Sequence, residues 1–129
     1  MTISDSDLDY LVSIVADAGV TEIMPRFRNL SASDVSEKTS VIDLVTEADL
    51  LAEKRITAAL LERFPTAHIV GEEAYDADRS VVPALVDAPL AFVIDPIDGT
   101  FNYASGLPAF GTLLAVTIKG ETVAGIIHD

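Results

Sequence analysis

The sequence contains no cysteine, and this absence removes several kinds of chemistry at once. Without cysteine the chain has no disulfide framework, no thiolate metal site and no thiol nucleophile. Histidine is nearly as scarce, with 2 residues among 129. Any metal ion would therefore have to be held by oxygen atoms or by one of these two histidines.

Basic residues and long apolar runs are also lacking. The chain has 8 lysines and arginines against 21 aspartates and glutamates, which gives a formal net charge of −13 at pH 7. No basic cluster offers the electrostatic footprint of a nucleic-acid-binding protein, and no apolar run approaches the ~20 residues that span a bilayer. We therefore predict a soluble, cytoplasmic protein that binds neither nucleic acid nor a membrane.

What is present is a composition able to fold, because 50% of the residues are hydrophobic. The length fits one domain with a real core. Apolar spacing predicts an amphipathic helix over Asp7–Phe27, weakened at Gly19 and Pro25. A second helix is predicted to follow Thr46, its N-cap, and to stop at Pro65.

Short apolar runs bounded by turn residues predict the strands. They lie at 41–45, 67–70, 90–94, 111–118 and 121–127, the last two as a hairpin through Lys119-Gly120. The polar residues 29–40 are predicted to form a mobile loop. Helices come first and strands later, so we predict an α+β fold, a layered helix/sheet domain with a mainly antiparallel sheet. The last strand has no covering segment, and we expect its edge to pair with a neighbour.

Acidic residues gather where two of the predicted strands end. Pro96 is expected to end one strand and to turn the chain so that Asp95 and Asp98 point toward one place. Upstream, Glu72 follows another buried strand. If the two strands lie side by side, these three carboxylates converge and raise one another's pKa, which a divalent cation would relieve. Oxygen ligands without cysteine favour Mg²⁺.

The residues after Asp98 add to this cluster. Gly99 lets the backbone approach a ligand closely, and Thr100 is expected to open a helix whose free N–H groups favour an anion. Taken singly, an Asp-Gly pair is typical of a turn, and Asp49 is typical of a first-turn acid that complements the helix dipole. The gathering of acids at strand ends favours a catalytic or binding site.

The stretch D-P-I-D-G-T at residues 95–100 leaves a choice between a nucleophile and metal ligands. Haloacid-dehalogenase-type phosphatases carry D-x-D-G-T, in which the first aspartate is the nucleophile. Acids at i and i+2 lie on one side of an extended chain, whereas the two acids here are at i and i+3. The spacing therefore favours metal ligands.

Four pieces of the sequence together resemble the inositol monophosphatase family. They are Lys38, DLVTEAD at 43–49, GEE at 71–73 and DPIDGTFNYASGLP at 95–108, in the order and spacing of the family's amino-terminal half. The resemblance covers nearly the whole chain and implies the amino-terminal half of an αβαβα sugar-phosphatase-type sandwich. It also implies hydrolysis of a phosphorylated polyol, sugar or nucleotide by metal-activated water, and a homodimer at full length.

The resemblance implies a role for each site residue, with two or three Mg²⁺ ions as cofactors. The first ion would be held by Glu72, Asp95 and the Ile97 carbonyl, and Asp95 and Asp98 would contribute to the second. The residues that would contact the substrate are Lys38, Glu72, Ile97, Asp98, Gly99 and Thr100. The catalytic residues that would position and deprotonate the attacking water are Asp49, Glu72 and Thr100.

The resemblance also implies what these residues do not supply. Family members run to roughly twice this length, still within one compact unit, and their second half carries a Trp-Asp segment that completes the second metal site. This sequence has no tryptophan. We therefore expect residues 1–129 to be a truncated amino-terminal domain with little phosphatase activity alone. The alternative is a non-catalytic metal-binding or regulatory module that pairs through its exposed strand edge.

Overall fold

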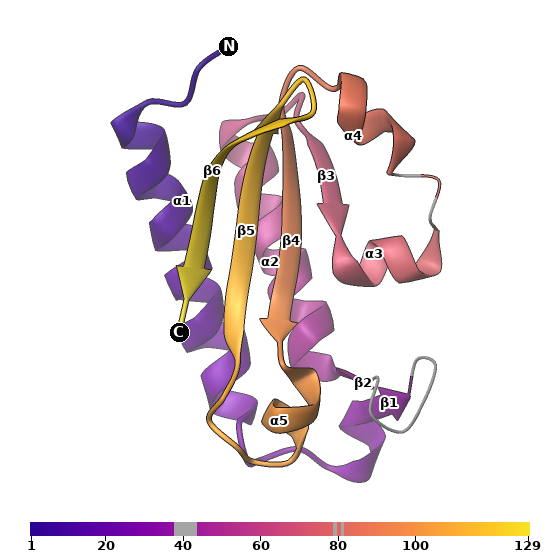
Figure 1. The fold of residues 1–129 in the computed structure, drawn as a ribbon. Coiled ribbons are helices and arrows are strands. Elements are labelled where there is room, and N and C mark those ends of the chain that lie inside the picture. Colours follow the sequence, from indigo (N-terminus) through magenta and orange to yellow (C-terminus); the bar gives the residue numbers. More distant parts are fainter. Residues whose placement is uncertain (38–43, 79, 81) are drawn as a thin grey trace.

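A computed structural model describes residues 1–37, 44–78, 80 and 82–129. Figure 1 shows the fold as a sheet with the long helices α1 and α2 behind it. The sheet has the order β3-β4-β5-β6, and a separate ribbon pairs β1 with β2. The strands are β1 (Val35–Glu37), β2 (Leu44–Thr46), β3 (His68–Gly71), β4 (Ala91–Asp98), β5 (Gly111–Ile118) and β6 (Glu121–His128). The predicted α+β class is confirmed.

The helices lie behind one face of this sheet, beside β3 at one edge, and at the end of β4 (Figure 1). They are α1 (Asp5–Ala18), the π-helix η1 (Gly19–Ile23), the short 3₁₀ helices η2 (Met24–Arg26) and η3 (Ala32–Asp34), α2 (Glu47–Arg63), α3 (Glu72–Ala77), α4 (Pro83–Asp87) and α5 (Thr100–Ala104). The predicted weak point at Gly19 is where α1 gives way to η1. Among the described residues, no helix is both long and apolar enough to cross a membrane.

Helix α2 packs into the core through an inner face of small and aliphatic residues that lie one turn apart. Ala48, Ala52, Ile56 and Leu60 are all fully buried, at the i, i+4 spacing that keeps one face of a helix in line. The helix begins with a capping box, in which the Thr46 and Asp49 side chains each bond the other's backbone N–H. The predicted start and end of this helix are confirmed.

The segment before α2 differs from the prediction of a mobile loop over residues 29–40. Part of it is ordered into η3 and β1, and β1 pairs antiparallel with β2 so that Val35 lies opposite Thr46. The polar sequence around β1 has no strand pattern of its own. The strand is defined by its pairing with β2. The predicted strand at 41–45 overlaps β2, while residues 38–43, including Lys38, lie outside the described residues.

Strand β4 does not end at Asp95, and the predicted turn at Pro96 is wrong. The strand continues to Asp98, with an irregularity in its register against β5 between Asp95 and Asp98. Pro96 cannot donate a ladder hydrogen bond, but its carbonyl accepts one from the Thr112 hydroxyl of β5 at 2.8 Å. This bond keeps the bulged stretch on the sheet. The predicted β5–β6 hairpin is confirmed, with Lys119 and Gly120 both at positive φ.

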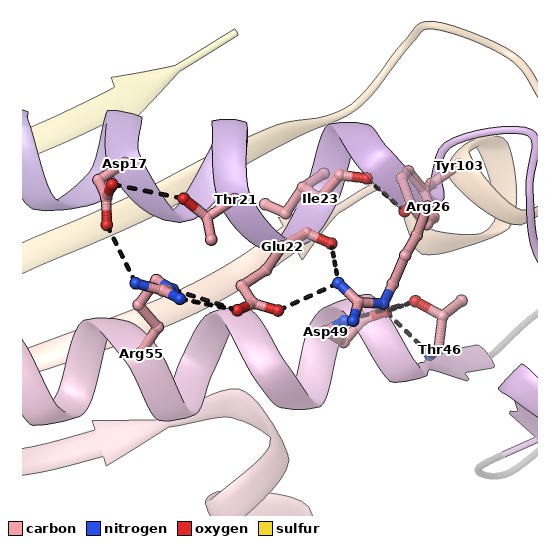
Figure 2. Close-up of polar contacts among 9 residues, drawn as sticks. All are labelled: Asp17, Thr21, Glu22, Ile23, Arg26, Thr46, Asp49, Arg55 and Tyr103. Carbon is pink, nitrogen blue, oxygen red and sulfur yellow. Dashed lines mark hydrogen bonds and ion pairs between the residues drawn. The ribbon is translucent and has the colours of Figure 1, made fainter.

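Helix α5 is anchored to η1 through a buried tyrosine. The Tyr103 hydroxyl donates to the Ile23 carbonyl at 2.7 Å, and its ring packs edge-on against Phe110. Figure 2 shows this bond beside an ion-pair network that ties η1 to α2. In that network Glu22 pairs with Arg26 at 3.0 Å and with Arg55 at 3.1 Å. The Tyr103 hydrogen bond and the Glu22–Arg55 ion pair thus fix α5 and α2 relative to η1.

We expect Tyr103→Phe to lower the free energy of unfolding by about 1–3 kcal/mol, because it removes the donor from a buried carbonyl. Urea denaturation measures the loss. Tyr10→Phe is the matched comparison, since its hydroxyl donates to Ala59 O at 2.7 Å in a partly buried place. A loss for Tyr10→Phe equal to or greater than that for Tyr103→Phe would contradict this account.

Candidate active site

The parallel pairing of β3 with β4 brings two carboxylates together. In this register Gly71 lies opposite Ile94, so the residues that follow, Glu72 and Asp95, lie side by side at the same end of the sheet. Parallel strands share their carboxyl ends, where ligands bind in layered α/β arrangements. The adjacency that the sequence-based metal site requires is therefore present.

Asp95 lies in an environment that disfavours its charge. Burial, together with a hydrogen bond and charge from Glu72 and the charges of Asp98 and Asp49, raises the pKa of Asp95 to about 8. Its Oδ1 atom is buried without a hydrogen-bond partner among the described residues. Near neutral pH, Asp95 therefore keeps its proton, which a cation can replace.

The oxygen atoms at this place fit a divalent ion. The Glu72 and Asp95 carboxylates and the buried carbonyl of Ile97 are hard donors of the kind that Mg²⁺ takes, and the orphaned Asp95 Oδ1 needs a partner. Within the part of the chain that the structure describes, no three acidic or histidine side chains gather around one point. A site on these residues therefore consists of two carboxylates and a backbone carbonyl.

Asp98 takes a different position from the other two acids. It is the last residue of β4, lies opposite Gly111 in the register, and is exposed. Its charge still raises the pKa of Asp95. The bulge in β4 thus separates Asp98 from the Glu72–Asp95 pair and leaves it on the open side of the site.

Asp49 uses its two carboxylate oxygens for two different contacts. Oδ2 accepts from the Thr46 backbone N–H at 2.9 Å and from the Thr46 hydroxyl at 2.5 Å. Oδ1 accepts from the Thr100 hydroxyl at 2.9 Å. Burial raises the pKa of Asp49, against the opposing effect of these bonds. Figure 2 shows the Thr46 side of this arrangement. Asp49 is therefore both a helix cap and a residue of the candidate site.

Thr100 lies between the two groups of oxygens. Its hydroxyl is 2.9 Å from Asp49 Oδ1 and 2.9 Å from the Ile97 carbonyl. A hydroxyl has one hydrogen, so it donates to only one of these oxygens at a time. When an ionised Asp49 takes this hydrogen, the Ile97 carbonyl is open to another partner.

Gly99 is needed where β4 meets α5. Its φ is 90°, and a Cβ there would lie 2.8 Å from the Ala109 carbonyl oxygen. The left-handed backbone and the close approach each make any residue other than glycine costly at this position. Gly99 therefore sets the angle at which α5, beginning at Thr100, leaves the sheet end.

One residue beside the site was not predicted from the sequence. Glu53 of α2 accepts a hydrogen bond from the Glu73 backbone N–H at 2.9 Å. It follows Asp49 by four residues and so lies on the same face of α2. That spacing is the signal that could have identified it.

We expect the metal-free chain to lose stability as pH rises from about 4 to about 8, because the folded state binds the Asp95 proton more tightly than the unfolded state does. Asp95→Asn should remove this dependence and make the chain more stable than wild type at pH 8. Urea unfolding with a chelator across this pH range measures both effects. The exposed Asp98→Asn is the control, with a smaller change expected. An Asp95→Asn variant less stable than wild type at pH 8 would refute this account.

Known proteins with this sequence pattern and fold were found by comparison. Inositol monophosphatase 1 of Saccharomyces cerevisiae is 30% identical over 127 residues, covering 95% of this chain and 42% of the relative. Inositol monophosphatase 2 of Homo sapiens is 39% identical over 94 residues, covering 73% and 32%. The chain therefore spans less than half the length of these curated relatives.

Solved structures agree with the sequence relatives. The IMPase of Thermotoga maritima has a TM-score of 0.78 at 29% identity, covering 95% of this chain and 44% of that structure. The extragenic suppressor protein suhB of Bartonella henselae has a TM-score of 0.75 at 29% identity, covering 95% and 45%. Residues 5–129 match the sequence pattern that defines the Inositol monophosphatase family. With sequence and fold in agreement over nearly all of its length, the chain belongs to the inositol monophosphatase family.

Proposed function

We propose that these residues form the metal- and water-handling part of a site that hydrolyses a small phosphate monoester. The observation that carries this proposal is the adjacency of the Glu72 and Asp95 carboxylates, close to the Asp49–Thr100 hydrogen bond. Two relatives are named inositol monophosphatases, so an inositol phosphate is the first candidate substrate. Related polyol, sugar and nucleotide phosphates are the next candidates.

Glu72, Asp95 and the Ile97 carbonyl would hold one Mg²⁺, and Asp95 and Asp98 would contribute to a second. Metal ions of this kind supply Lewis-acid stabilisation of the charge on phosphoryl oxygens. Asp95 must give up its proton to bind a cation. The raised pKa of Asp95, about 8, therefore makes cation binding stronger as pH rises through this value.

Asp49 and Thr100 would handle the proton of the attacking water. Asp49 is fully buried, and Thr100 is partly exposed, so a water on the open side reaches Asp49 through the Thr100 hydroxyl. The 2.9 Å bond between them allows Thr100 to pass its hydrogen to Asp49 while it accepts one from water. Burial raises the pKa of Asp49 and so makes it a better proton acceptor.

The start of α5 would bind the phosphate group. Gly99 and Thr100 lie at the N-terminal end of this helix, where the first backbone N–H groups have no partner within the helix. Such N–H groups favour an anion. Lys38 is proposed to approach the same substrate, as the family resemblance implies.

We expect millimolar Mg²⁺ to raise the melting temperature of the chain at pH 8, because binding to the folded state alone stabilises it by mass action. Asp95→Asn should abolish this increase, whereas Asp87→Asn should keep it, because Asp87 ends α4 and precedes the opposite end of β4. Thermal unfolding with and without Mg²⁺ measures the effect. No increase for the wild-type chain at millimolar metal would favour the non-catalytic interaction module.

We expect Thr100→Ala to lower Mg²⁺-dependent phosphate release from inositol 1-phosphate by about 100-fold, the lower end of what a proton-transfer group contributes. Thr100→Ser keeps the hydroxyl and should retain most of the activity. Because the 129 residues alone are expected to release little phosphate, release is measured on them and on a hybrid completed by the second part of the yeast relative. Equal rates for Thr100→Ala and wild type would rule out the proton relay.

A further inference from the structure

We propose that Glu53 is a positioning residue of the metal site, which from α2 holds the first turn of α3 and thereby sets the direction of Glu72. The inference rests on the proposed function, because it takes Glu72 as a metal ligand. Glu53 itself does not contact the metal in this account. Its effect passes through the backbone next to the ligand.

The contact that carries the inference joins parts of the chain 20 residues apart. The Glu53 Oε1 atom accepts from the Glu73 N–H at 2.9 Å in a partly buried place. Helix α3 begins at Glu72, and its N-cap, Gly71, has no side chain with which to cap it. Glu53 therefore supplies from another helix the acceptor that an N-cap residue normally supplies. Its negative charge also suits the positive end of the helix dipole.

Gly71 supports this interpretation independently. Its φ of −94° and ψ of 152° are ordinary extended values that any residue adopts, so the backbone does not require glycine. What requires it is space, because a Cβ at Gly71 would lie 2.6 Å from Glu53 Oε2 and would collide with Glu53 Cδ and Oε1. The missing side chain makes room for the Glu53 carboxylate.

Helix α2 thus reaches both strand ends of the site from one face. Asp49 bonds Thr100, which follows β4, and Glu53 bonds the backbone that follows β3. These two acids are one helical turn apart. The rigid spacing along α2 therefore sets how far Glu72 lies from the Asp49–Thr100 pair.

Loss of this contact should weaken metal binding more than it weakens the fold. Without Glu53 the Glu73 N–H turns to water, and Glu72 samples more directions before it binds a cation. Hydrogen-bond partners that orient metal ligands change metal affinity by about 10–100-fold. We expect the lower end, about 10-fold, because Glu53 holds the backbone beside the ligand rather than the ligand oxygen.

The test measures Mn²⁺ affinity by electron paramagnetic resonance of the free ion, with wild type, Glu53→Ala, Gly71→Ala and the double variant. Both single variants should bind about 10-fold more weakly, since the methyl group of Gly71→Ala displaces the flexible Glu53 carboxylate. The double variant should be no weaker than Glu53→Ala, because both changes remove one contact. Additive losses, or wild-type affinity in either single variant, would overturn the proposal.

Two further variants separate the hydrogen bond from charge. Glu53→Gln keeps an acceptor oxygen and should bind Mn²⁺ nearly as wild type does. Glu62→Ala removes a negative charge from an exposed position of the same helix and should leave the affinity unchanged. Affinity in Glu53→Gln as low as in Glu53→Ala would show that charge, not the bond, matters and would overturn the positioning role.

Amide hydrogen exchange of the metal-free chain tests the Glu53–Glu73 hydrogen bond separately from metal binding. Exchange at the Glu73 N–H should be faster in Glu53→Ala and Gly71→Ala than in wild type, with the β4–β5 ladder unchanged. Unchanged exchange at Glu73 would overturn the positioning role whatever the metal result. If wild type bound no Mn²⁺ at millimolar concentration, the proposed function would fail and with it the role of Glu72 as a ligand.

Discussion

The parallel pairing of β3 with β4 is the constraint on which the candidate site depends. It is the one parallel pair in the sheet that the structure describes, and only parallel neighbours end at the same edge. An antiparallel pairing would place Glu72 and Asp95 at opposite ends of the sheet. The crossover through α3 and α4 makes the parallel direction possible, and it also places the first residue of α3 at the site.

The gathering of acids at this end of the sheet lowers the stability of the fold while it provides the candidate metal ligands. The partly buried carboxyl of Asp95, with the acids Glu72, Asp98 and Asp49 nearby, costs folding free energy at neutral pH. The fold accepts this cost because the neighbouring elements are held independently: Tyr103 anchors α5 to η1, and the buried face of α2 packs against the sheet. Active sites commonly keep such unfavourable charge, which substitution can relieve at the expense of activity.

Local patterns predicted most of the elements because those elements are defined locally. The α2 capping box at Thr46 and Asp49, the apolar runs of β3 and β4, and the Lys119-Gly120 hairpin each depend on neighbours a few residues away. The errors have the opposite character. The continuation of β4 past Pro96 depends on Thr112 of β5, and β1 depends on its pairing with β2.

The sequence by itself determined the chemistry available to this protein: oxygen donors without cysteine, the D-P-I-D-G-T spacing that favours ligands over a nucleophile, and the family signature. Only the tertiary structure decided which oxygens meet. It divided Asp49 between Thr46 and Thr100, and it brought Glu53 to the space that Gly71 leaves. The physical reason is that such contacts join residues far apart in the chain, so they exist only after α2 has packed against the sheet.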